Sequence, residues 1–186
     1  MKSVLIVSGH PNLAQSNANK AIIDELKHLL PNAEVSDLGA LYPDFKIAVE
    51  AEQKKLLNAD VIVWQAPVYW YSVPAILKKW IDDVFTYGFA YGGTGDKLKG
   101  KKLILSFTAG AGVEDYTPEN EGEKPFENLL PPHKETAALC QLSLLDPVIS
   151  FGMMYLPSLS PESALTALQS KAKDHARQVF DQISNL

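Results

Sequence analysis

The sequence has one cysteine among its 186 residues, Cys140. A single thiol can neither close an internal disulfide nor supply a cysteine-based metal cluster. Its neighbours in the stretch AALCQL are mostly apolar, which predicts an inert, buried thiol instead of a reactive one. We therefore expect no disulfide and no metal site.

Long hydrophobic runs and an excess of positive charge are also lacking. No stretch approaches the ~18 consecutive apolar residues of a membrane-spanning helix, and the opening run VLIV is too short for the core of a signal peptide. The net charge of -5 disfavours nucleic acid as a partner, because neutralising phosphates requires a basic face. These absences predict a soluble, cytoplasmic protein that does not bind nucleic acid.

The sequence does contain enough apolar residues for one core. Hydrophobic residues make up 46% of the chain and charged residues 21%, which is ordinary for a soluble domain. The length favours a single domain over residues 1–186, because two domains would each be unusually small.

Short apolar runs alternate with longer segments of helical periodicity. Strands are expected at residues 4–7, 35–38, 60–66, 102–107 and 146–151. The apolar runs at residues 4–7 and 60–66 are typical of strands buried on both faces. Apolar stripes at helical spacing predict helices, and they cover residues 22–30, 47–58, 74–85, 126–141 and a closing segment from Pro161. Ser160 is the expected cap of that last helix, and Glu162 suits its positive end. The alternation predicts an α/β fold, a parallel sheet with helices on both faces.

Two stretches fit neither pattern. They are residues 88–100, with the sequence GFAYGGTGDKLKG, and residues 110–133, which are rich in Gly, Pro and Glu. Loops of this length in a compact domain usually carry function or are disordered. The acidic stretch from Glu114 to Glu127 is expected to be a solvated loop.

In a doubly wound sheet, ligands bind beyond the carboxyl ends of the strands. The first loop at that edge, HPNLAQSNANK, leads into a helix start with Ser16, Asn17 and Asn19. Their hydroxyl, amide and backbone N–H donors suit a phosphate, and Lys20 and His10 are nearby sources of positive charge. The alternative is an ordinary capped helix, and neither GxGxxG nor GxxxxGK[ST] is present.

The loops after the third and fourth strands complete the expected site. The first of these, PVYWYS, carries Tyr69, Trp70 and Tyr71; each alone suits a core position, but together they could form a stacking wall for a flat ligand. The second, TAGAG, has almost no side chains, so it is either a plain turn or a place of close approach to a ligand. Tyr116 beyond it adds a phenol that can donate or accept a hydrogen bond. Together the three loops predict a site for flavin mononucleotide.

Several motifs resemble the flavodoxin-like NAD(P)H:quinone oxidoreductases. They are LIVSGHP and SNAN near the amino terminus, WYSVPAILKKWIDDVF, GFAYG followed by LKGKK, and TAGAG. The motif LYPDF, followed by AEQ, most resembles the bacterial branch that includes the ancillary subunit of the glutathione-gated potassium efflux system. The resemblance runs from residue 2 to about residue 155. It implies a flavodoxin-like, doubly wound, five-stranded parallel sheet of order 2-1-3-4-5, forming one flavin-binding domain.

The resemblance also implies which residues bind the cofactor, which is FMN with FAD as the alternative. The matches for the phosphate and ribityl chain are His10, Ser16, Asn17, Ala18 and Asn19. The matches beside the central ring are Pro67, Val68, Tyr69 and Trp70, and those at the pyrimidine end are Thr108, Ala109, Gly110 and Ala111. For the substrate, Trp70 and Tyr71 match the pocket floor, and Tyr91 matches an aromatic lent by the partner subunit of a homodimer with shared active sites.

Animal relatives carry a Tyr and then a His after the third loop, which help to manage charge on the reduced flavin. Tyr116 fits the spacing of that Tyr and is the expected catalytic residue, whereas Gly122 stands where the His would be. We therefore expect Tyr116, the backbone and water to stabilise the reduced cofactor.

The resemblance implies a ping-pong, two-electron hydride transfer from NAD(P)H, through the flavin N5 atom, to a quinone. Two alternatives stay open. One is a regulatory, ancillary subunit of a membrane potassium efflux channel, with secondary reductase activity and a peripheral position at the inner membrane; the other is a flavodoxin-type electron carrier. A phospho-receiver domain is excluded because the third strand ends without an acceptor aspartate, and a serine hydrolase is excluded because GxSxG is absent.

Overall fold

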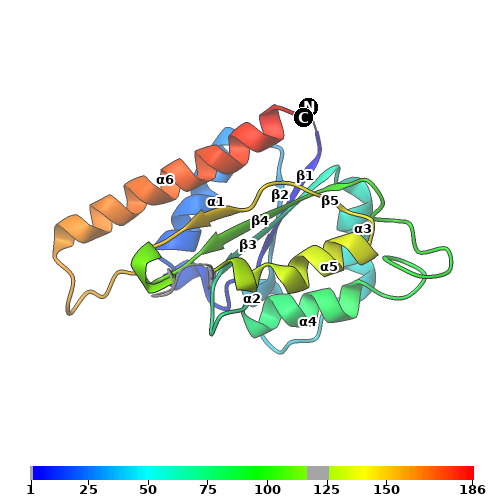
Figure 1. The fold of residues 1–186 in the computed structure, drawn as a ribbon, viewed down its shortest axis with the longest axis horizontal. Helices are drawn as coiled ribbons and strands as arrows, with labels where there is room; N and C mark the ends of the chain where they lie inside the picture. Colours follow the sequence, from blue (N-terminus) through cyan, green and yellow to red (C-terminus); the bar gives the residue numbers. More distant parts are fainter. Residues whose placement is uncertain (1, 117–125) are drawn as a thin grey trace.

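The apolar runs form one parallel sheet at the centre of the molecule (Figure 1). The computed structural model describes residues 2–116 and 126–186. Its strands are β1 (Val4–Ser8), β2 (Glu34–Asp37), β3 (Val61–Pro67), β4 (Lys102–Thr108), β5 (Ser143–Leu144) and β6 (Val148–Ser150). They follow the order β2-β1-β3-β4-β5, with β6 also paired to β4, and these pairings are parallel. The predicted α/β class and strand order are confirmed.

The predicted last strand, residues 146–151, is shorter than expected and is preceded by a separate strand. β5 and β6 pair with successive parts of β4, and residues 145–147 separate them. Pro147 lies in this gap and has no backbone N–H with which to extend the ladder, which accounts for the break.

Helices cover both faces of the sheet (Figure 1). They are α1 (Ala18–Leu29), α2 (Leu38–Leu41), α3 (Val49–Asn58), α4 (Ala75–Val84), α5 (Pro131–Leu139) and α6 (Glu162–Ser184), with short 3-10 turns η1 (Leu13–Gln15), η2 (Val113–Tyr116) and η3 (Glu127–Leu129). Side chains in register share a face of a parallel sheet. Ile6, Val63 and Ile104 therefore pack on one face with the apolar residues of α1 and α6.

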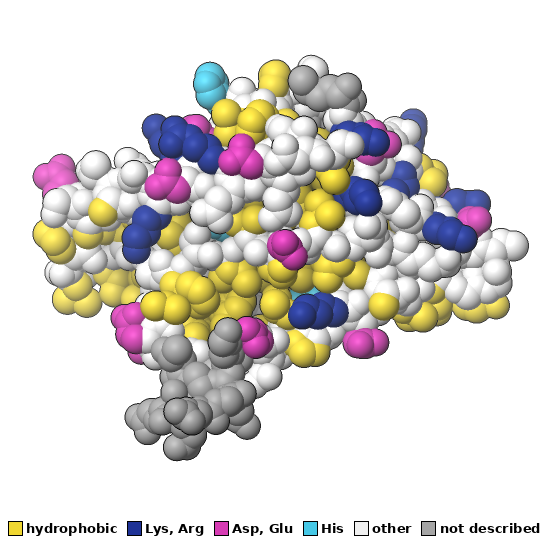
Figure 2. Space-filling view, turned by 45° about the horizontal axis from the view of Figure 1, so that its top comes forward, with side chains coloured by type: hydrophobic (Ala, Val, Ile, Leu, Met, Phe, Trp, Pro, Cys, Tyr) yellow, Lys and Arg dark blue, Asp and Glu magenta, His cyan; other side chains and the backbone are white. Residues whose placement is uncertain are grey.

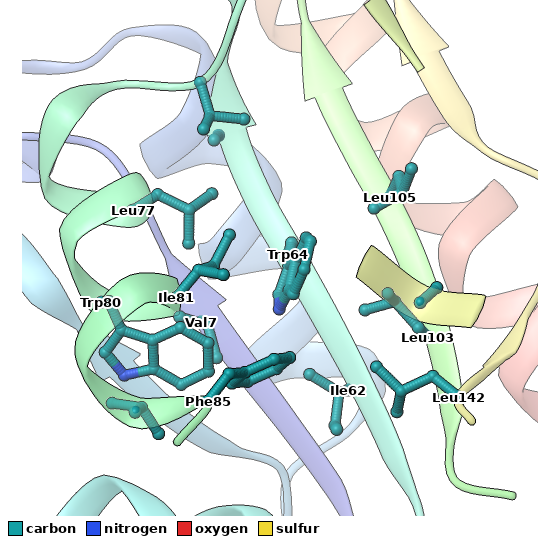
Figure 3. Close-up of a cluster of buried hydrophobic side chains, with 14 of the residues drawn as sticks. Val7, Ile62, Trp64, Leu77, Trp80, Ile81, Phe85, Leu103, Leu105 and Leu142 are labelled. Atoms are coloured by element: carbon teal, nitrogen blue, oxygen red, sulfur yellow. The ribbon is translucent and has the colours of Figure 1, made fainter. Parts of the chain in front are cut away.

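The opposite face holds the larger side chains. Val7, Trp64 and Leu105 lie in register there and pack against residues of α2, α3, α4 and α5. Figure 3 shows Trp80, Ile81 and other residues of α4 facing Trp64 across this layer. Because both faces are covered, β1 and β3 are buried along their whole length, as their uninterrupted apolar runs predict.

Two details of the predicted helices are wrong. The segment 126–141 is not one helix, because Pro131 and Pro132 cannot donate backbone hydrogen bonds; η3 ends before them and α5 begins at Pro131, where a missing N–H is tolerated. Ser160 does not cap α6. Its Oγ accepts a hydrogen bond from the Leu156 N–H at 3.2 Å, and Pro161 occupies the cap position without a side-chain cap bond.

A buried carboxylate joins three elements on the α3 side of the sheet. Glu52 is fully buried; its Oε1 accepts from Tyr42 Oη at 2.7 Å and Lys55 Nζ at 2.6 Å, and its Oε2 accepts from Ser36 Oγ and Trp80 Nε1, both at 2.9 Å. Burial acts to raise the pKa of Glu52, but the hydrogen bonds from Lys55, Tyr42, Trp80 and Ser36 together outweigh it and hold the pKa below its usual value. The cluster ties α3 to β2 and α4.

Cys140 is buried, and burial raises the pKa of its thiol, as the apolar neighbours predict. Over the two described ranges, no helix combines the length and apolar character needed to cross a bilayer. Among those same residues, no group of three or more His, Cys, Asp or Glu side chains could hold a metal ion.

Candidate functional site

The loops that follow β1, β3 and β4 converge at the carboxyl edge of the sheet. Ser8, Gln65 and Ser106 are in register, so the three strands end side by side. A cleft of about 430 Å³ lies between the loops, within the roughly 300–1,000 Å³ common for small-molecule sites. Its lining residues are His10, Ser16, Asn17, Ala18, Asn19, Pro67, Val68, Tyr69, Thr108, Gly110, Met153, Met154 and Tyr155.

The start of α1 forms one end of the cleft. Ser16 Oγ accepts a hydrogen bond from the Asn19 N–H at 3.0 Å. The serine therefore caps the helix, as expected for the alternative of an ordinary capped helix. The first N–H groups of a helix have no intrahelical acceptor. Since Asn19 is satisfied by Ser16, the N–H groups of Asn17 and Ala18, which line the cleft, are left to bind a ligand. The cap and an anion seat are compatible.

His10 and Lys20 do not bring positive charge into the cleft, although the sequence predicts both as sources of it near the start of α1. Burial lowers the pKa of His10, and the opposing effect of Asp37 is smaller, so the imidazole is neutral at neutral pH. Its Nδ1 accepts a hydrogen bond from the Asn12 N–H at 3.0 Å, which leaves Nε2 as a donor. Lys20 forms an ion pair with Asp24 and does not line the cleft. The donors that line this end of the cleft are therefore backbone and neutral side-chain groups, whereas Lys20 lines a neighbouring hollow that also includes Ser16 and Asn17.

The aromatic residues after β3 lie on a two-residue turn. Tyr69 and Ser72 exchange two backbone hydrogen bonds, at 2.9 and 3.0 Å, and the residues between them, Trp70 and Tyr71, have φ angles of 48° and 61°. Such turns favour the sequence Asn-Gly, because Gly and Asn tolerate positive φ best. Most other residues are strained there by roughly 1–2 kcal/mol each. Trp70 is 94% exposed and Tyr71 is 66% exposed. The alternative that these two aromatics are core residues is excluded.

A second hollow of about 200 Å³ adjoins the cleft and shares Val68 with it. It is lined by Val68, Trp70, Tyr71, Ala111, Asp115 and Tyr116. The ring of Tyr116 packs against Phe126 and Phe151, with centroids 5.4 and 5.3 Å away. Burial raises the pKa of Tyr116, and the nearby Tyr71 and Asp115 raise it further. Its phenol is therefore protonated at neutral pH and can donate a hydrogen bond.

Two of the predicted site residues line neither hollow. The Ala109 side chain is fully buried in the core, its N–H donates to Ser150 O, and its carbonyl accepts from Met153 N. Tyr91 packs edge to face on Tyr87 at 5.9 Å, in the loop before β4 that Figure 1 shows projecting from the opposite end of the molecule. Gly122 and much of the acidic stretch Glu114–Glu127 lie outside the described residues.

Met153, Met154 and Tyr155 line the cleft but are absent from the predicted site. They follow β6, whose carboxyl end reaches the same edge as the other strands. The signal was present in the sequence, because a strand was expected at residues 146–151 and its following loop had to emerge at this edge.

A larger groove, of about 800 Å³, lies where β1 begins, at the other edge of the sheet. It is lined by Lys2, Leu29, Leu30, Asp60, Phe180, Ile183, Ser184 and Leu186. Its lining is mostly aliphatic and aromatic and lacks the converging donors of the carboxyl edge, so the cleft is the stronger candidate.

The fold and the cleft define a doubly wound α/β protein with a candidate ligand site at the carboxyl edge of its sheet. The chain belongs to the family of flavodoxin-like fold, whose model matches residues 2–178. This family membership confirms the resemblance that the sequence motifs indicate.

Known proteins similar to the chain agree with this family. The chain is 40% identical, over 179 residues and 96% of each chain, to the glutathione-regulated potassium-efflux system ancillary protein KefF of Enterobacter sp. (strain 638). General stress protein 14 of Treponema denticola, solved in complex with FMN, matches with a TM-score of 0.83 and 34% identity, over 98% of this chain and 99% of that one. An NADPH-quinone reductase from P. pentosaceus matches with a TM-score of 0.74 and 28% identity, over 95% and 98%.

Proposed function

We propose that the chain is a flavin-dependent NAD(P)H:quinone oxidoreductase that holds FMN in the cleft. The observation that carries this proposal is the convergence of a helix N-terminus, an aromatic turn and a small-residue loop on that cleft. The FMN complex of a 34% identical protein and the name of a 28% identical quinone reductase support it.

The residues at the start of α1 fit the phosphate end of FMN. The N–H groups of Asn17 and Ala18 would donate to phosphate oxygens, and the hydroxyl proton of Ser16 is free to do the same while its lone pair accepts from Asn19. The helix dipole adds favourable potential for an anion. This donor set needs no cationic side chain, which agrees with the neutral His10.

The loops after β3 and β4 fit the flat ring. The two hydrogen bonds of the 69–72 turn use the N–H groups of Tyr69 and Ser72, so those of Trp70 and Tyr71 remain for ring heteroatoms. Gly110 lines the cleft without a side chain, which allows the ring to approach the backbone there. FMN rather than FAD is proposed because the 34% identical structure holds FMN.

When bound, FMN would supply the hydride chemistry between NAD(P)H and a quinone. The chain would bind and orient the reactants. Trp70 and Tyr71 offer faces on which a nicotinamide or a quinone can stack, and Tyr116, protonated at neutral pH, would donate a hydrogen bond at the neighbouring hollow.

We propose further that the protein acts as a homodimer. Trp70, Tyr71 and Met154 around the cleft are 94%, 66% and 59% exposed. Figure 2 shows that hydrophobic side chains also gather at the surface on the face drawn there. Large exposed apolar areas commonly mark interaction sites. Tyr91, which lines neither the cleft nor the second hollow, would then reach the site of the partner subunit.

The purified protein is expected to be yellow, to release FMN that mass spectrometry identifies, and to oxidise NADPH or NADH in the presence of a simple quinone. Gel filtration with light scattering would give the mass of a dimer. A colourless protein that stays inactive after FMN is added would overturn the assignment.

The 40% identity to an ancillary protein of a potassium-efflux system supports a second function, in which the protein docks on a membrane potassium-efflux protein and has a peripheral location. Co-purification with a tagged efflux protein from membranes would support it. Reductive titration separates both functions from the electron carrier: uptake of electrons in pairs favours the oxidoreductase, and uptake one at a time favours the carrier.

Gly39 in α2 supports the first loop of the proposed FMN site. A Cβ at this position would lie 2.5 Å from Pro11 O and 2.6 Å from His10 O, so Gly39→Ala must displace the loop. We expect about tenfold weaker FMN binding, or about 1.4 kcal/mol, measured by quenching of FMN fluorescence. The exposed neighbour provides the control: Ala40→Gly should leave FMN binding unchanged. Equal affinity in Gly39→Ala and the wild type would contradict this role of the loop.

A further inference from the structure

A row of polar side chains crosses the α1 and α6 face of the sheet, directly beneath the cleft. Ser8, Gln65 and Ser106 are in register at the last layer before the carboxyl edge, where Ile6, Val63 and Ile104 make the apolar layer below. Asn19 from α1 and His175 from α6 meet this row, and both are buried, as are Gln65 and Ser106. Most buried polar groups in proteins are hydrogen-bonded, because burying an unpaired one is costly.

Five hydrogen bonds connect Gln65, Ser106, Asn19 and His175 with Ser150 and Thr108 into one chain that ends at the cleft. The hydroxyl of Ser8 has no partner and is not part of this chain. Ser150 Oγ lies 2.8 Å from His175 Nδ1, and His175 Nε2 lies 2.8 Å from Ser106 Oγ. Ser106 Oγ donates to Gln65 Oε1 at 2.5 Å, and Gln65 Nε2 donates to Asn19 Oδ1 at 2.8 Å. Asn19 Nδ2 then donates to Thr108 Oγ1 at 3.0 Å. Thr108 lines the cleft.

The bonds of this chain all run in one direction. Ser106 has one hydroxyl proton and donates it to Gln65, so His175 Nε2 must be the donor to Ser106. Burial lowers the pKa of His175 to about 4, so the ring is neutral and Nδ1 accepts from Ser150. At the other end Thr108 Oγ1 accepts from Asn19, which leaves its own proton free. If the chain ran in reverse, Thr108 would donate to Asn19 and present only lone pairs to the cleft.

We propose that His175 is a positioning residue which, as its Nε2–H tautomer, sets the direction of this chain and thereby makes Thr108 Oγ1 a hydrogen-bond donor to the ligand in the cleft. The ligand atom above Thr108 is then an acceptor, such as a carbonyl, ring nitrogen or phosphate oxygen. That the ligand is FMN rests on the proposed function, whereas the direction of the chain does not.

The tautomer can be measured without any flavin. Long-range ¹H–¹⁵N correlation spectra of the protein freed of flavin should show His175 neutral at pH 7, with the proton on Nε2. The assignment comes from the loss of these signals in His175→Gln. A proton on Nδ1 would mean that the chain runs in reverse and would overturn the proposal, whether or not FMN binds.

The transmitted effect requires a double-mutant cycle. Thr108→Val keeps the shape of the side chain and removes the donor, and His175→Leu removes the group that sets the direction; each should weaken FMN binding about five- to tenfold. If His175 acts through Thr108, adding His175→Leu to Thr108→Val should weaken binding no further. Independent losses that multiply would overturn the proposal.

Two variants separate positioning from folding. His175→Gln keeps an N–H donor near Ser106 and should restore most of the FMN affinity that His175→Leu loses. Val179→Ala disturbs the packing of the same helix at a fully buried position outside the hydrogen-bonded chain, and should lower the melting temperature without changing FMN affinity.

Should His175→Leu not fold, Ser150→Ala tests the same point from the other end, because His175 then loses the donor that fixes its tautomer. If His175 loses its Nε2 proton in Ser150→Ala and the FMN affinity stays unchanged, the proposal is overturned.

Discussion

Replacing Ser16 by aspartate is expected to weaken FMN binding about 100-fold, or about 2.8 kcal/mol, while leaving the helix capped. Aspartate is as good an N-cap as serine, so it can keep the hydrogen bond from the Asn19 N–H. Its carboxylate, however, would stand where the phosphate is proposed to bind. Placing two like charges next to each other costs several kcal/mol of binding free energy. Titration of FMN fluorescence measures the loss.

Riboflavin is the matched control ligand because it has the same ring and ribityl chain but no phosphate. Ser16→Asp should change the riboflavin affinity by less than about threefold, and Ser16→Asn, which caps without charge, should keep most of the FMN affinity. An equal loss for FMN and riboflavin would show that the substitution distorts the cleft and that the phosphate does not bind at Ser16.

Glu52→Gln is expected to lower the free energy of unfolding by about 3 kcal/mol at pH 7. The amide keeps one acceptor oxygen, but its NH₂ group faces the donors of two of the four partners, Tyr42, Lys55, Ser36 and Trp80. Removing one member of a buried ion pair typically costs roughly 3–5 kcal/mol, and the lower end applies because Lys55 is 21% exposed and can turn to water. Urea unfolding followed by circular dichroism measures the difference.

The pH dependence gives this prediction a second readout. The pKa of Glu52 is lowered in the folded protein, so its contribution is complete above the unfolded-state pKa of roughly 4.3 and is lost as the pH falls through the folded-state pKa. The gap in stability between wild type and Glu52→Gln should therefore be constant near neutral pH and narrow in acid below about pH 4. Glu50→Gln, an exposed change in the same helix, should alter stability by less than about 0.5 kcal/mol. A gap that does not narrow in acid would exclude the carboxylate as its source.

The centre of the sheet was predictable because β1, β3 and β4 are mainly apolar runs that are buried on both faces. The loops that form the candidate cleft could also be located, since parallel strands place their carboxyl ends at one edge. The sequence did not predict which of two nearby hydrogen-bond partners a capping side chain takes. Ser160 is a good capping residue, but its hydroxyl accepts from Leu156 instead, and nothing local distinguishes the two donors.

The polar chain beneath the cleft was out of reach for a different reason. Its members Asn19, Gln65, Ser106 and His175 come from four separate elements, and single polar residues inside apolar strands or on a helix carry no periodic signal. Only the strand register brings Gln65 beside Ser106, and only the packing of α6 brings His175 to them. The exposure of Trp70 could not be predicted from the sequence either. A run of three aromatic residues suits a core equally well, and only the turn between Tyr69 and Ser72 places Trp70 at the surface.

The three tryptophans of the chain occupy two opposite environments: Trp64 and Trp80 are sealed from solvent, whereas Trp70 is 94% exposed. Collisional quenchers such as iodide or acrylamide therefore reach the indole at the rim of the cleft and spare the other two. The quenchable share of the protein's own emission reports, without any label, whether a ligand or another molecule covers that rim.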